Sequence, residues 1–352
     1  MRTLYVTLPI DRDGAFSGAA AASMGDAQSG YTAERAMADV LCFGNLQLDV
    51  LCRPLTAPPA PGELREIEGI DVALSGNGGN VAMALGRLGI DAALAGYYGA
   101  DVVGEQLRAT LDGAGVNTTA LRRHPTAGTG ISVIHVAPNG ERGILFVNGA
   151  NADVELETVP DATLRGARVV LVSAVFVLPR FTGQAIALLF ARARAAGAVT
   201  ALNVCWDHAR RGLPFLAPAL AETNLFVLNH DEGRQLTGRS RPEDILDALE
   251  AVTRGAVVLT LGPEGSMLRG EDGPCRIPAA PVVATDSTGA GDSFLAGVIA
   301  GLVTGRTLKG CARLGSRVAA YAVTGPGAYP RIPTLDEIDR LYGYDAYEGG
   351  PP

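Results

Sequence analysis

The chain has 352 residues, a formal net charge of -8 and a hydrophobic content of 47%. This length suits one large α/β domain with an appendage, or two domains. The acidic balance argues against nucleic acid as a partner, and no apolar run is long enough to cross a bilayer, so we expect a soluble, cytoplasmic protein with no membrane partner.

The number and spacing of the lysine, cysteine and histidine residues exclude further classes of function. Lys309 is the only lysine, and it does not follow a glycine-rich loop. A P-loop kinase is therefore excluded, because its loop needs a lysine after the glycines. The five cysteines lack metal-type spacing and the four histidines are scattered, so neither a zinc site nor a Ser-His-Asp triad is expected.

The chain begins with a segment, residues 1–38, that is rich in Ala, Gly, Ser and Asp and has no sustained periodicity. We interpret it as an N-terminal extension of uncertain order. The domain proper is expected over residues 39–345 and opens with an apolar strand at 39–45. Residues 346–352 are expected to form a tail.

Two β-type segments interrupt this domain, at about 47–76 and 128–150. The first joins a proline-rich stretch to an alternating one at 64–74, and the second has the turn Asn139-Gly140 between two β-type runs. Asn-Gly in this setting is a strong hairpin signal. We expect the two segments to pair into a small β-sheet lid.

In the remaining sequence, strand-like and helix-like segments alternate between about residues 92 and 261. Such alternation is typical of right-handed βαβ units, which place helices on both faces of a mostly parallel sheet. The predicted fold class is therefore α/β, with three layers (α/β/α), a mostly parallel sheet and the small lid.

A glycine-rich loop, S-G-N-G-G-N at 75–80, leads into a helix of small residues. A dinucleotide-binding fingerprint is the alternative interpretation of this loop. However, Val81 stands where that fingerprint needs its third glycine, and the loop follows the first β-type segment instead of the first strand. Asn80 also suits a helix N-cap.

A second loop, D-S-T-G-A-G-D-S-F at 286–294, follows an apolar run and enters another helix. The unpaired N–H groups and the dipole of a helix start favour an anion there. Asp292 would repel a phosphate, but it suits a base that takes the proton of a hydroxyl attacking one. The loop therefore indicates phosphoryl transfer, with a simple N-capped helix as the alternative.

Five motifs, spread over residues 40 to about 335, resemble those of the ribokinase-like, or phosphofructokinase B-type, carbohydrate kinases. They are G-N-L-Q-L-D at 44–49, S-G-N-G-G-N at 75–80, N-H-D-E at 229–232, V-V-L-T-L-G-P-E-G at 257–265 and D-S-T-G-A-G-D-S-F at 286–294. The resemblance implies the ribokinase-like version of the three-layer fold. It also implies an ATP-dependent phosphotransferase with an alcohol group as acceptor.

The resemblance implies roles for the residues that carry the chemistry. Asp292 would be the general base, and the N–H groups of Gly289, Ala290 and Gly291 would stabilise charge on the transferred group. The sugar hydroxyls would be held by Gln47, Asp49, Gly76, Asn77 and Asn80. A carboxylate such as Asp49 accepts two hydrogen bonds from a vicinal diol, although an aspartate that merely forms a turn is the alternative.

Further roles concern the phosphate donor and its ions. ATP would lie along Asn229, Thr260, Gly262, Gly265 and Ser316. Glu232 would organise Mg²⁺ through water, since Mg²⁺ is usually held by few carboxylates, and a solvated acid at a helix start is the alternative. Asp286 and Thr288 would contribute to a monovalent-cation site, with K⁺ as the candidate ion.

Two positively charged side chains found in related kinases are missing from this sequence, and their absence bears on the identity of the phosphoryl acceptor. Asn77 stands where phosphosugar kinases of this family carry Lys, and A-L-N-V-C at 201–205 lacks the arginine of kinases for acidic keto-sugars. A charged acceptor would then lack a counter-charge, unless Arg142 in the hairpin supplies it. We expect a neutral sugar, a pentose or ketohexose, with a nucleoside or cyclitol as the alternative. For a nucleoside, the candidate shelves for the base are Phe146, Phe176 and Trp206.

Two further expectations concern the oligomeric state and whether the protein is an enzyme. Edge-to-edge pairing of the lid through residues 131–147 predicts a homodimer. A non-catalytic sugar-sensing homologue is a remoter alternative, but such proteins tend to lose the base or the anion hole, and this sequence retains both motifs.

Overall fold

The structure is a computed structural model that describes residues 38–139, 141–158, 161–269, 274–285, 287–325 and 332–343. Apart from Ala38, the expected N-terminal extension lies outside these residues, as do the expected tail and Asp286. Within the described part of the chain, no helix is both long and apolar enough to span a membrane.

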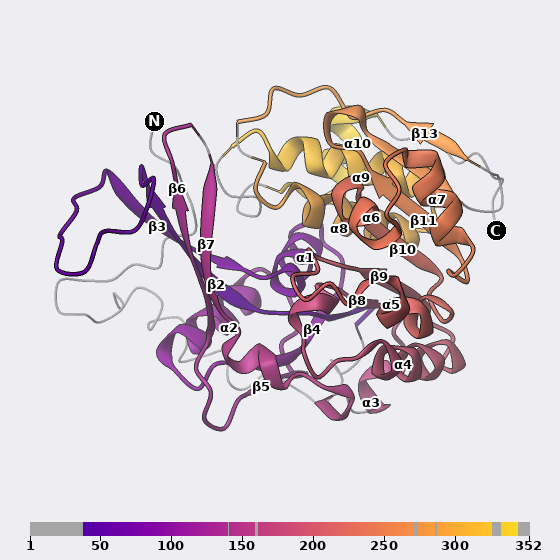
Figure 1. Cartoon of the computed structure of the whole chain (residues 1–352). Helices are drawn as coiled ribbons and strands as arrows, with labels where there is room; N and C mark the ends of the chain where they lie inside the picture. The colour runs from indigo at the N-terminus through magenta and orange to yellow at the C-terminus, as the bar shows by residue number, and fades with distance from the viewer. Residues whose placement is uncertain are drawn as a thin grey trace.

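A nine-stranded sheet forms the centre of the molecule (Figure 1). The seven strands from β5 to β11 run parallel, and β12 and β13 add an antiparallel edge. In spatial order the strands are β13 (Cys275–Ile277), β12 (Ser266–Arg269), β11 (Ala256–Thr260), β10 (Leu225–Asn229), β9 (Val199–Asn203), β8 (Val169–Val172), β1 (Val40–Phe43), β4 (Ala92–Tyr98) and β5 (Leu121–Arg123).

Helices cover both faces of this sheet, as the alternating sequence predicts. One layer contains α1 (Asn77–Arg87), α2 (Val102–Gly113), α8 (Ala290–Val303), α9 (Leu308–Ala322) and α10 (Leu335–Tyr342). The other contains α4 (Gly183–Ala195), α5 (Gly212–Leu220), α6 (His230–Thr237) and α7 (Pro242–Glu250). A short helix, α3 (Asp161–Leu164), precedes β8. The predicted three-layer α/β/α class is confirmed.

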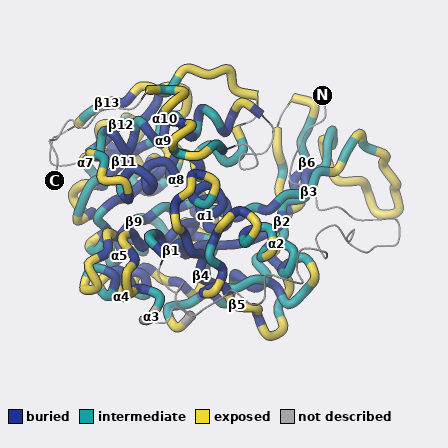
Figure 2. Tube along the Cα trace, turned by 180° about the vertical axis from the view of Figure 1, so that it is seen from behind, coloured by how far each residue is buried: buried dark blue, intermediate teal, exposed yellow. Residues whose placement is uncertain are grey.

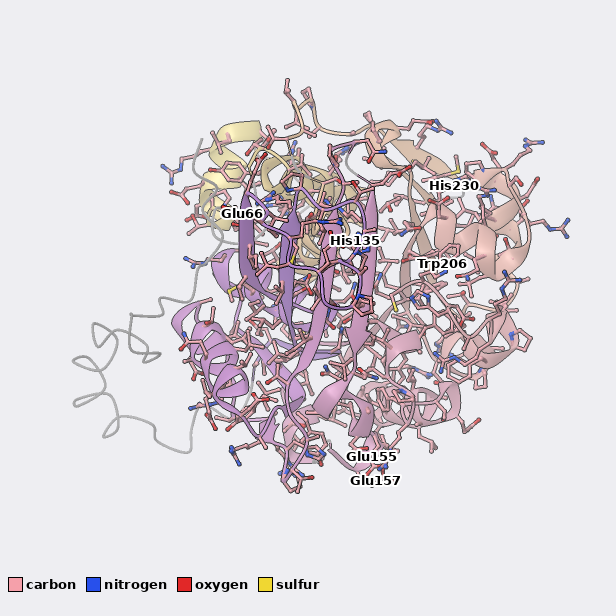
Figure 3. All side chains as sticks on the ribbon, turned by 60° about the vertical axis from the view of Figure 1, so that its left-hand side comes forward. Glu66, His135, Glu155, Glu157, Trp206 and His230 are labelled. Atoms are coloured by element: carbon pink, nitrogen blue, oxygen red, sulfur yellow. The ribbon has the colours of Figure 1, made fainter. Side chains whose placement is uncertain are left out.

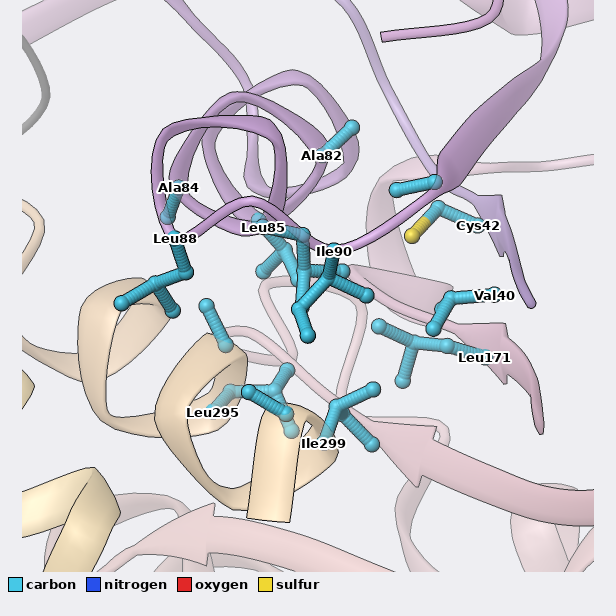
Figure 4. Packing of buried hydrophobic residues seen from close by; sticks show 14 of the residues in the cluster. Val40, Cys42, Ala82, Ala84, Leu85, Leu88, Ile90, Leu171, Leu295 and Ile299 are labelled. Carbon is cyan, nitrogen blue, oxygen red and sulfur yellow. The ribbon is translucent and has the colours of Figure 1, made fainter. Parts of the chain in front are cut away.

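The central strand β1 shows why the sheet is buried on both faces. Successive side chains of a strand point to opposite faces, and Val40 and Cys42 belong to the core on the α1 and α8 side. Leu41 and Phe43 belong to the core on the α4 and α5 side. Figure 4 shows Val40 and Cys42 on the side of the sheet that α1 and α8 cover. A continuous apolar strand is therefore required here.

A separate four-stranded sheet, the small sheet, projects from one side of this body (Figure 1). Its order is β3 (Gly69–Ser75), β2 (Gln47–Arg53), β6 (Gly130–Val136) and β7 (Arg142–Val147). The two β-type segments of the sequence thus pair through the parallel strands β2 and β6. In Figure 2 its outer loop is largely exposed, whereas buried residues gather in the body.

The register of the small sheet assigns its side chains to two faces. Asp49 pairs with Ser132, which pairs with Phe146, so these three side chains share one face, here called the inner face. The neighbouring row, Val50, Val133 and Leu145, lies on the opposite, outer face. On the outer face, Ile70, Val133, Leu145 and Val147 are exposed.

Helix α8 is set in place by close contact with α9. A Cβ atom on Gly297 would lie 2.7 Å from the Cα atom of Gly315, so only glycine permits the two backbones to approach this closely. The rest of α8 is buried from Ser293 to Gly301. This packing fixes where the first turn of α8, which carries Asp292, meets the rest of the molecule.

Candidate active site

Loops at the carboxyl ends of the parallel strands meet at one edge of the main sheet, which is where ligands bind in open α/β folds. Gly44 and Asn45 follow β1, Asn229 ends β10 and Thr260 ends β11. The sequence motifs are therefore brought together by the parallel topology, although they are far apart along the chain.

The start of α1 is held against the end of β1 by glycines. A Cβ atom on Gly78 would lie 2.7 Å from backbone atoms of Gly44, and one on Gly44 would lie 2.7 Å from the Cα atom of Gly78. Asn45 closes the junction, since its Oδ1 accepts a hydrogen bond from the N–H of Asn77 (2.9 Å) and its carbonyl accepts one from Gly79 (3.1 Å). Gly76, with φ of 89°, makes the turn into the helix.

Asp292 lies where the starts of α1 and α8 meet. Its Oδ1 accepts a hydrogen bond from the side-chain amide of Asn77 (2.9 Å), and its Oδ2 accepts one from the amide of Asn80 (2.7 Å). Asn77 and Asn80 are three residues apart on α1 and therefore project from the same side of the helix. The structure thus joins the two loops that the sequence singled out.

Burial is the main influence on the acidity of Asp292. It raises the pKa of this carboxyl to about 6, while the hydrogen bonds from Asn80 and Asn77 act to lower it and the charge of Asp49 acts to raise it. A carboxyl with a pKa near neutrality is suited to accept a proton.

Asp49 faces the same region from the small sheet. The structure places it on a chain of hydrogen bonds in which the Asn45 amide donates to Gln47 Oε1 (2.8 Å) and the Gln47 amide donates to Asp49 Oδ1 (3.1 Å). The Gln47 amide also donates to the Ser132 hydroxyl (2.7 Å). Gln47 is buried, so its amide links β1, β2 and β6 and orients Asp49.

Partial burial raises the pKa of Asp49 above its ordinary value. Hydrogen bonds with Ser75, Gln47 and Ser132 act in the opposite direction, as does the positive charge of Arg142. Arg142, at the start of β7, also donates a hydrogen bond to the hydroxyl of Thr288 (3.1 Å). This arginine therefore connects the small sheet to the loop before α8.

Asn229 and Glu232 open α6 with a capping box. The Asn229 side chain accepts from the Glu232 N–H (2.8 Å), and Glu232 Oε2 accepts from the Asn229 N–H (2.9 Å). Burial raises the pKa of Glu232 to about 7, and the charges of Asp292 and Asp231 add to this effect. The pair therefore caps the start of α6, and the carboxyl of Glu232 also lies within electrostatic reach of Asp292.

The residues expected along ATP lie at the ends of β10 and β11, in the turn that follows β11 and on α9. Thr260 pairs with Asn229 across the parallel strands β10 and β11. Gly262 and Gly265 follow in a short turn with positive φ angles, 59° and 93°. Ser316, on α9, accepts a hydrogen bond from the N–H of Ala280 (2.8 Å).

Helix α8 begins without a side-chain cap. Gly289 is its N-cap residue, in the left-handed conformation (φ 72°), and no side chain bonds the first turn. The N–H of Ala290 donates a hydrogen bond to the carbonyl oxygen of Ser287 (3.2 Å). Within the described part of the chain, no three His, Cys, Asp or Glu side chains cluster as a metal site.

Sequence reasoning missed three contributors to the site. Asn45 joins the first strand to α1, and Ser75 and Ser132 support Asp49. Asn45 lies within the first motif and could have been found there. Ser132 has no local signal, because only the parallel pairing of β2 with β6 brings it beside Asp49.

Comparison with known proteins places this geometry in a family. The family model described as pfkB family carbohydrate kinase matches residues 37–335. The chain is 24% identical over 321 residues to a deoxyribokinase of Salmonella typhi, covering 86% of this chain and 97% of that protein. It is 27% identical over 316 residues to a nucleoside kinase of Methanothermobacter thermautotrophicus, covering 88% and 97%.

The fold also matches solved structures. The structure of Arabidopsis thaliana ribokinase complexed with ribose and ATP superposes with a TM-score of 0.76 at 23% identity, covering 88% of this chain and 99% of that chain. The ribokinase-like fold and the family match over most of the chain agree with the motifs. The chain therefore belongs to the pfkB family of carbohydrate kinases, and it is a phosphotransferase with an alcohol group as acceptor.

Proposed function

We propose that this enzyme transfers the γ-phosphoryl group of ATP to a hydroxyl of a neutral sugar, a pentose or ketohexose, with Asp292 as the general base. The position of Asp292 carries the proposal. It lies in the first turn of the uncapped helix α8, beside the α1 amides and within electrostatic reach of Asp49. The Arabidopsis ribokinase, which shares the fold, was solved with ATP, and this supports ATP as the donor.

The reaction assigns each group a task. Asp49 accepts hydrogen bonds from sugar hydroxyls and so orients the acceptor. The reacting hydroxyl gives its proton to Asp292 while its oxygen bonds to the γ-phosphorus, and the bond from that phosphorus to the β–γ bridging oxygen breaks to release ADP. The N–H groups at the start of α8 would stabilise charge on the transferred group.

The charges around Asp49 favour a neutral acceptor. Asn77 places a neutral amide where a lysine would place a positive charge, and this amide donates a hydrogen bond to Asp292. Arg142 faces Asp49, whose negative charge offsets the positive charge of the arginine. A phosphate or carboxylate on the acceptor would have to share Arg142 with Asp49 and Thr288.

A nucleoside remains the alternative acceptor, and one observation favours it. Phe146 lies on the inner face in the same row as Asp49 and Ser132, and its side chain is 47% exposed. An exposed ring there could stack on a base. Of the other two candidates, Trp206 is half-exposed on the body of the molecule (Figure 3), whereas Phe176 is buried beneath the guanidinium of Arg211.

The acceptor class is tested by ADP release from MgATP with ribose, fructose, adenosine, inositol and fructose 6-phosphate. We expect a free sugar to give the highest kcat/KM. Phe146→Ala should then change the KM for the sugar little, but it should raise the KM for a nucleoside if that is the substrate. Turnover with fructose 6-phosphate alone would contradict a neutral acceptor. Binding of a sugar without turnover would favour the non-catalytic, sugar-sensing alternative.

Replacement of Asp292 by Asn tests the base. We expect a loss of kcat of roughly 10²- to 10⁴-fold, because general-base catalysis contributes about that much. The affinity for ATP, measured by calorimetry without acceptor, should be nearly unchanged. An Asp292→Asn enzyme with wild-type kcat would show that another group takes the proton.

We propose that Glu232 organises Mg²⁺ through water. The partly buried carboxyl of Glu232 lies within reach of the charge of Asp292, and a cation there would stabilise both ionised forms. Because the structure forms no cluster of three acidic or histidine ligands in its described part, the other ligands would be waters and ATP oxygens. The monovalent-cation site expected at Asp286 and Thr288 stays a prediction.

The Glu232→Gln variant separates this role from helix capping, since Gln also completes a capping box. We expect the Mg²⁺ concentration for half-maximal rate to rise several-fold, with an unchanged melting temperature and sugar KM. Asp231→Asn is the matched control, because Asp231 is the exposed neighbour in the same helical turn. An equal Mg²⁺ requirement in wild type and Glu232→Gln would remove Glu232 from the metal site.

We further propose that the outer face of the small sheet forms a homodimer with a second copy. Its exposed apolar side chains, Ile70, Val133, Leu145 and Val147, come from three strands of one sheet. Such a patch favours a partner of similar character, and a second copy presents the same apolar patch in a two-fold arrangement.

Light scattering tests this dimer. Wild type should show about twice the chain mass of 36.3 kDa, and Leu145→Glu should show the mass of one chain because it buries a charge in the interface. Leu188→Glu, a similar change at an exposed leucine on α4, should leave the dimer intact. A wild-type protein with the mass of one chain would count against the interface.

A further inference from the structure

The carboxylate of Asp292 is held by two amides that come from the same helix. Asn77 donates to Oδ1 (2.9 Å) and Asn80 donates to Oδ2 (2.7 Å), so each oxygen has one amide donor. Hydrogen bonds to a charged carboxylate are stronger than those between neutral groups and favour the ionised form. The two asparagines thus act on the protonation of Asp292 as well as on its orientation.

The two donors differ in how they are supported. Asn80 is only 7% exposed, and its side-chain oxygen, Oδ1, is buried without a hydrogen-bond partner among the described residues. Asn77 is the first residue of α1 and is partly exposed. Its backbone N–H is anchored by Asn45, but Asn77 is more accessible to solvent than the buried Asn80.

Charged groups from three other elements act on this region. The negative charge of Asp49 on β2 disfavours an ionised Asp292, and the charge of Asp292 in turn raises the pKa of Glu232 on α6. Arg142 of β7 faces Asp49 and Thr288. Asp292 itself sits in the first turn of α8, where the helix dipole favours a negative charge. The hydrogen bonds from the amides of Asn77 and Asn80 therefore oppose the effects of burial and of the Asp49 charge on Asp292.

We propose that Asn77 and Asn80 form an amide clamp that keeps Asp292 ionised, and that Asn77 is the half of the clamp that gives way to the reacting hydroxyl. This inference rests on the proposed role of Asp292 as the base. The buried Asn80 keeps its hydrogen bond to Oδ2 of Asp292 throughout the reaction. The acceptor hydroxyl approaches Oδ1 from the accessible side and replaces the amide of Asn77 as its hydrogen-bond donor. Asn77 is thus a positioning residue of the free enzyme.

The pH dependence of the rate separates this exchange from a purely structural role. The base works when it is ionised, so activity falls as the pH drops through the pKa of Asp292. Removal of a donor raises that pKa and moves this acid limb to higher pH. The limb in kcat/KM reports the free enzyme, and the limb in kcat reports the complex with substrate.

The experiment measures both profiles, with saturating MgATP, for wild type, Asn77→Ala, Asn77→Asp and Asn80→Ala. For Asn77→Ala we expect the limb in kcat/KM to move up by about one pH unit, a tenfold change in proton affinity, and the limb in kcat to stay in place. Asn80→Ala should move both limbs. Asn77→Asp, which adds a like charge, should move the limb in kcat/KM further than Asn77→Ala does.

The controls keep the proposal open to refutation. Asn139→Ala, at an exposed turn of the hairpin, should leave both limbs unchanged. The first position of a helix tolerates Ala and Asp, so the Asn77 variants are expected to fold even if Asn80→Ala does not. An unmoved kcat/KM limb in both Asn77 variants would overturn the clamp, and equal shifts of both limbs in Asn77→Ala would overturn the exchange.

The outcome is distinguishable from a failure of the proposed function. If Asp292 is not the base, Asp292→Asn retains turnover, whatever the Asn77 variants do. If Asp292→Asn is inactive and the Asn77 variants titrate like wild type, Asp292 is the base and the clamp is wrong.

Discussion

The partial burial of one carboxylate, that of Asp292, is the constraint on which the site depends. An ionised carboxyl taken out of water loses several kcal/mol of solvation unless hydrogen bonds or opposite charges replace that water. The protein supplies two amides from α1 and the positive end of α8 to Asp292. Both helix starts must therefore meet at this point, and the backbone contacts of Gly44 with Gly78 and of Gly297 with Gly315 bring them there.

Two buried side chains, Asn45 and Gln47, link the start of α1 to the small sheet. Asn45 contacts the backbone of Asn77 at one end and the side chain of Gln47 at the other, and Gln47 holds both Asp49 and Ser132. A continuous set of hydrogen bonds thus runs from Asp49 on β2 to the N-terminus of α1, where Asn77 donates to Asp292. Because Gln47 and Asn45 are buried, the distance between Asp49 and Asp292 is set by packed groups and not by mobile side chains.

Much of the fold could be predicted from local patterns. Continuous apolar strands such as β1, the alternation of strands with helices and the Asn-Gly turn each have a cause that acts within a few residues. The motif at 229–232 carried two interpretations, a capping box and a metal-organising carboxyl. The structure shows the capping box directly, while burial raises the pKa of Glu232. One side chain can therefore serve local structure and remain available to a ligand.

The layers and the glycine-rich helix starts could be predicted from the sequence, because they follow from residue type and short-range spacing. Which groups meet in the site, by contrast, follows from the fold of the whole chain. The pairing of Asp292 with Asn77 and Asn80 spans more than 210 residues, and that of Gln47 with Ser132 spans 85. Such contacts depend on strand order, register and helix packing, which are properties of the whole folded chain.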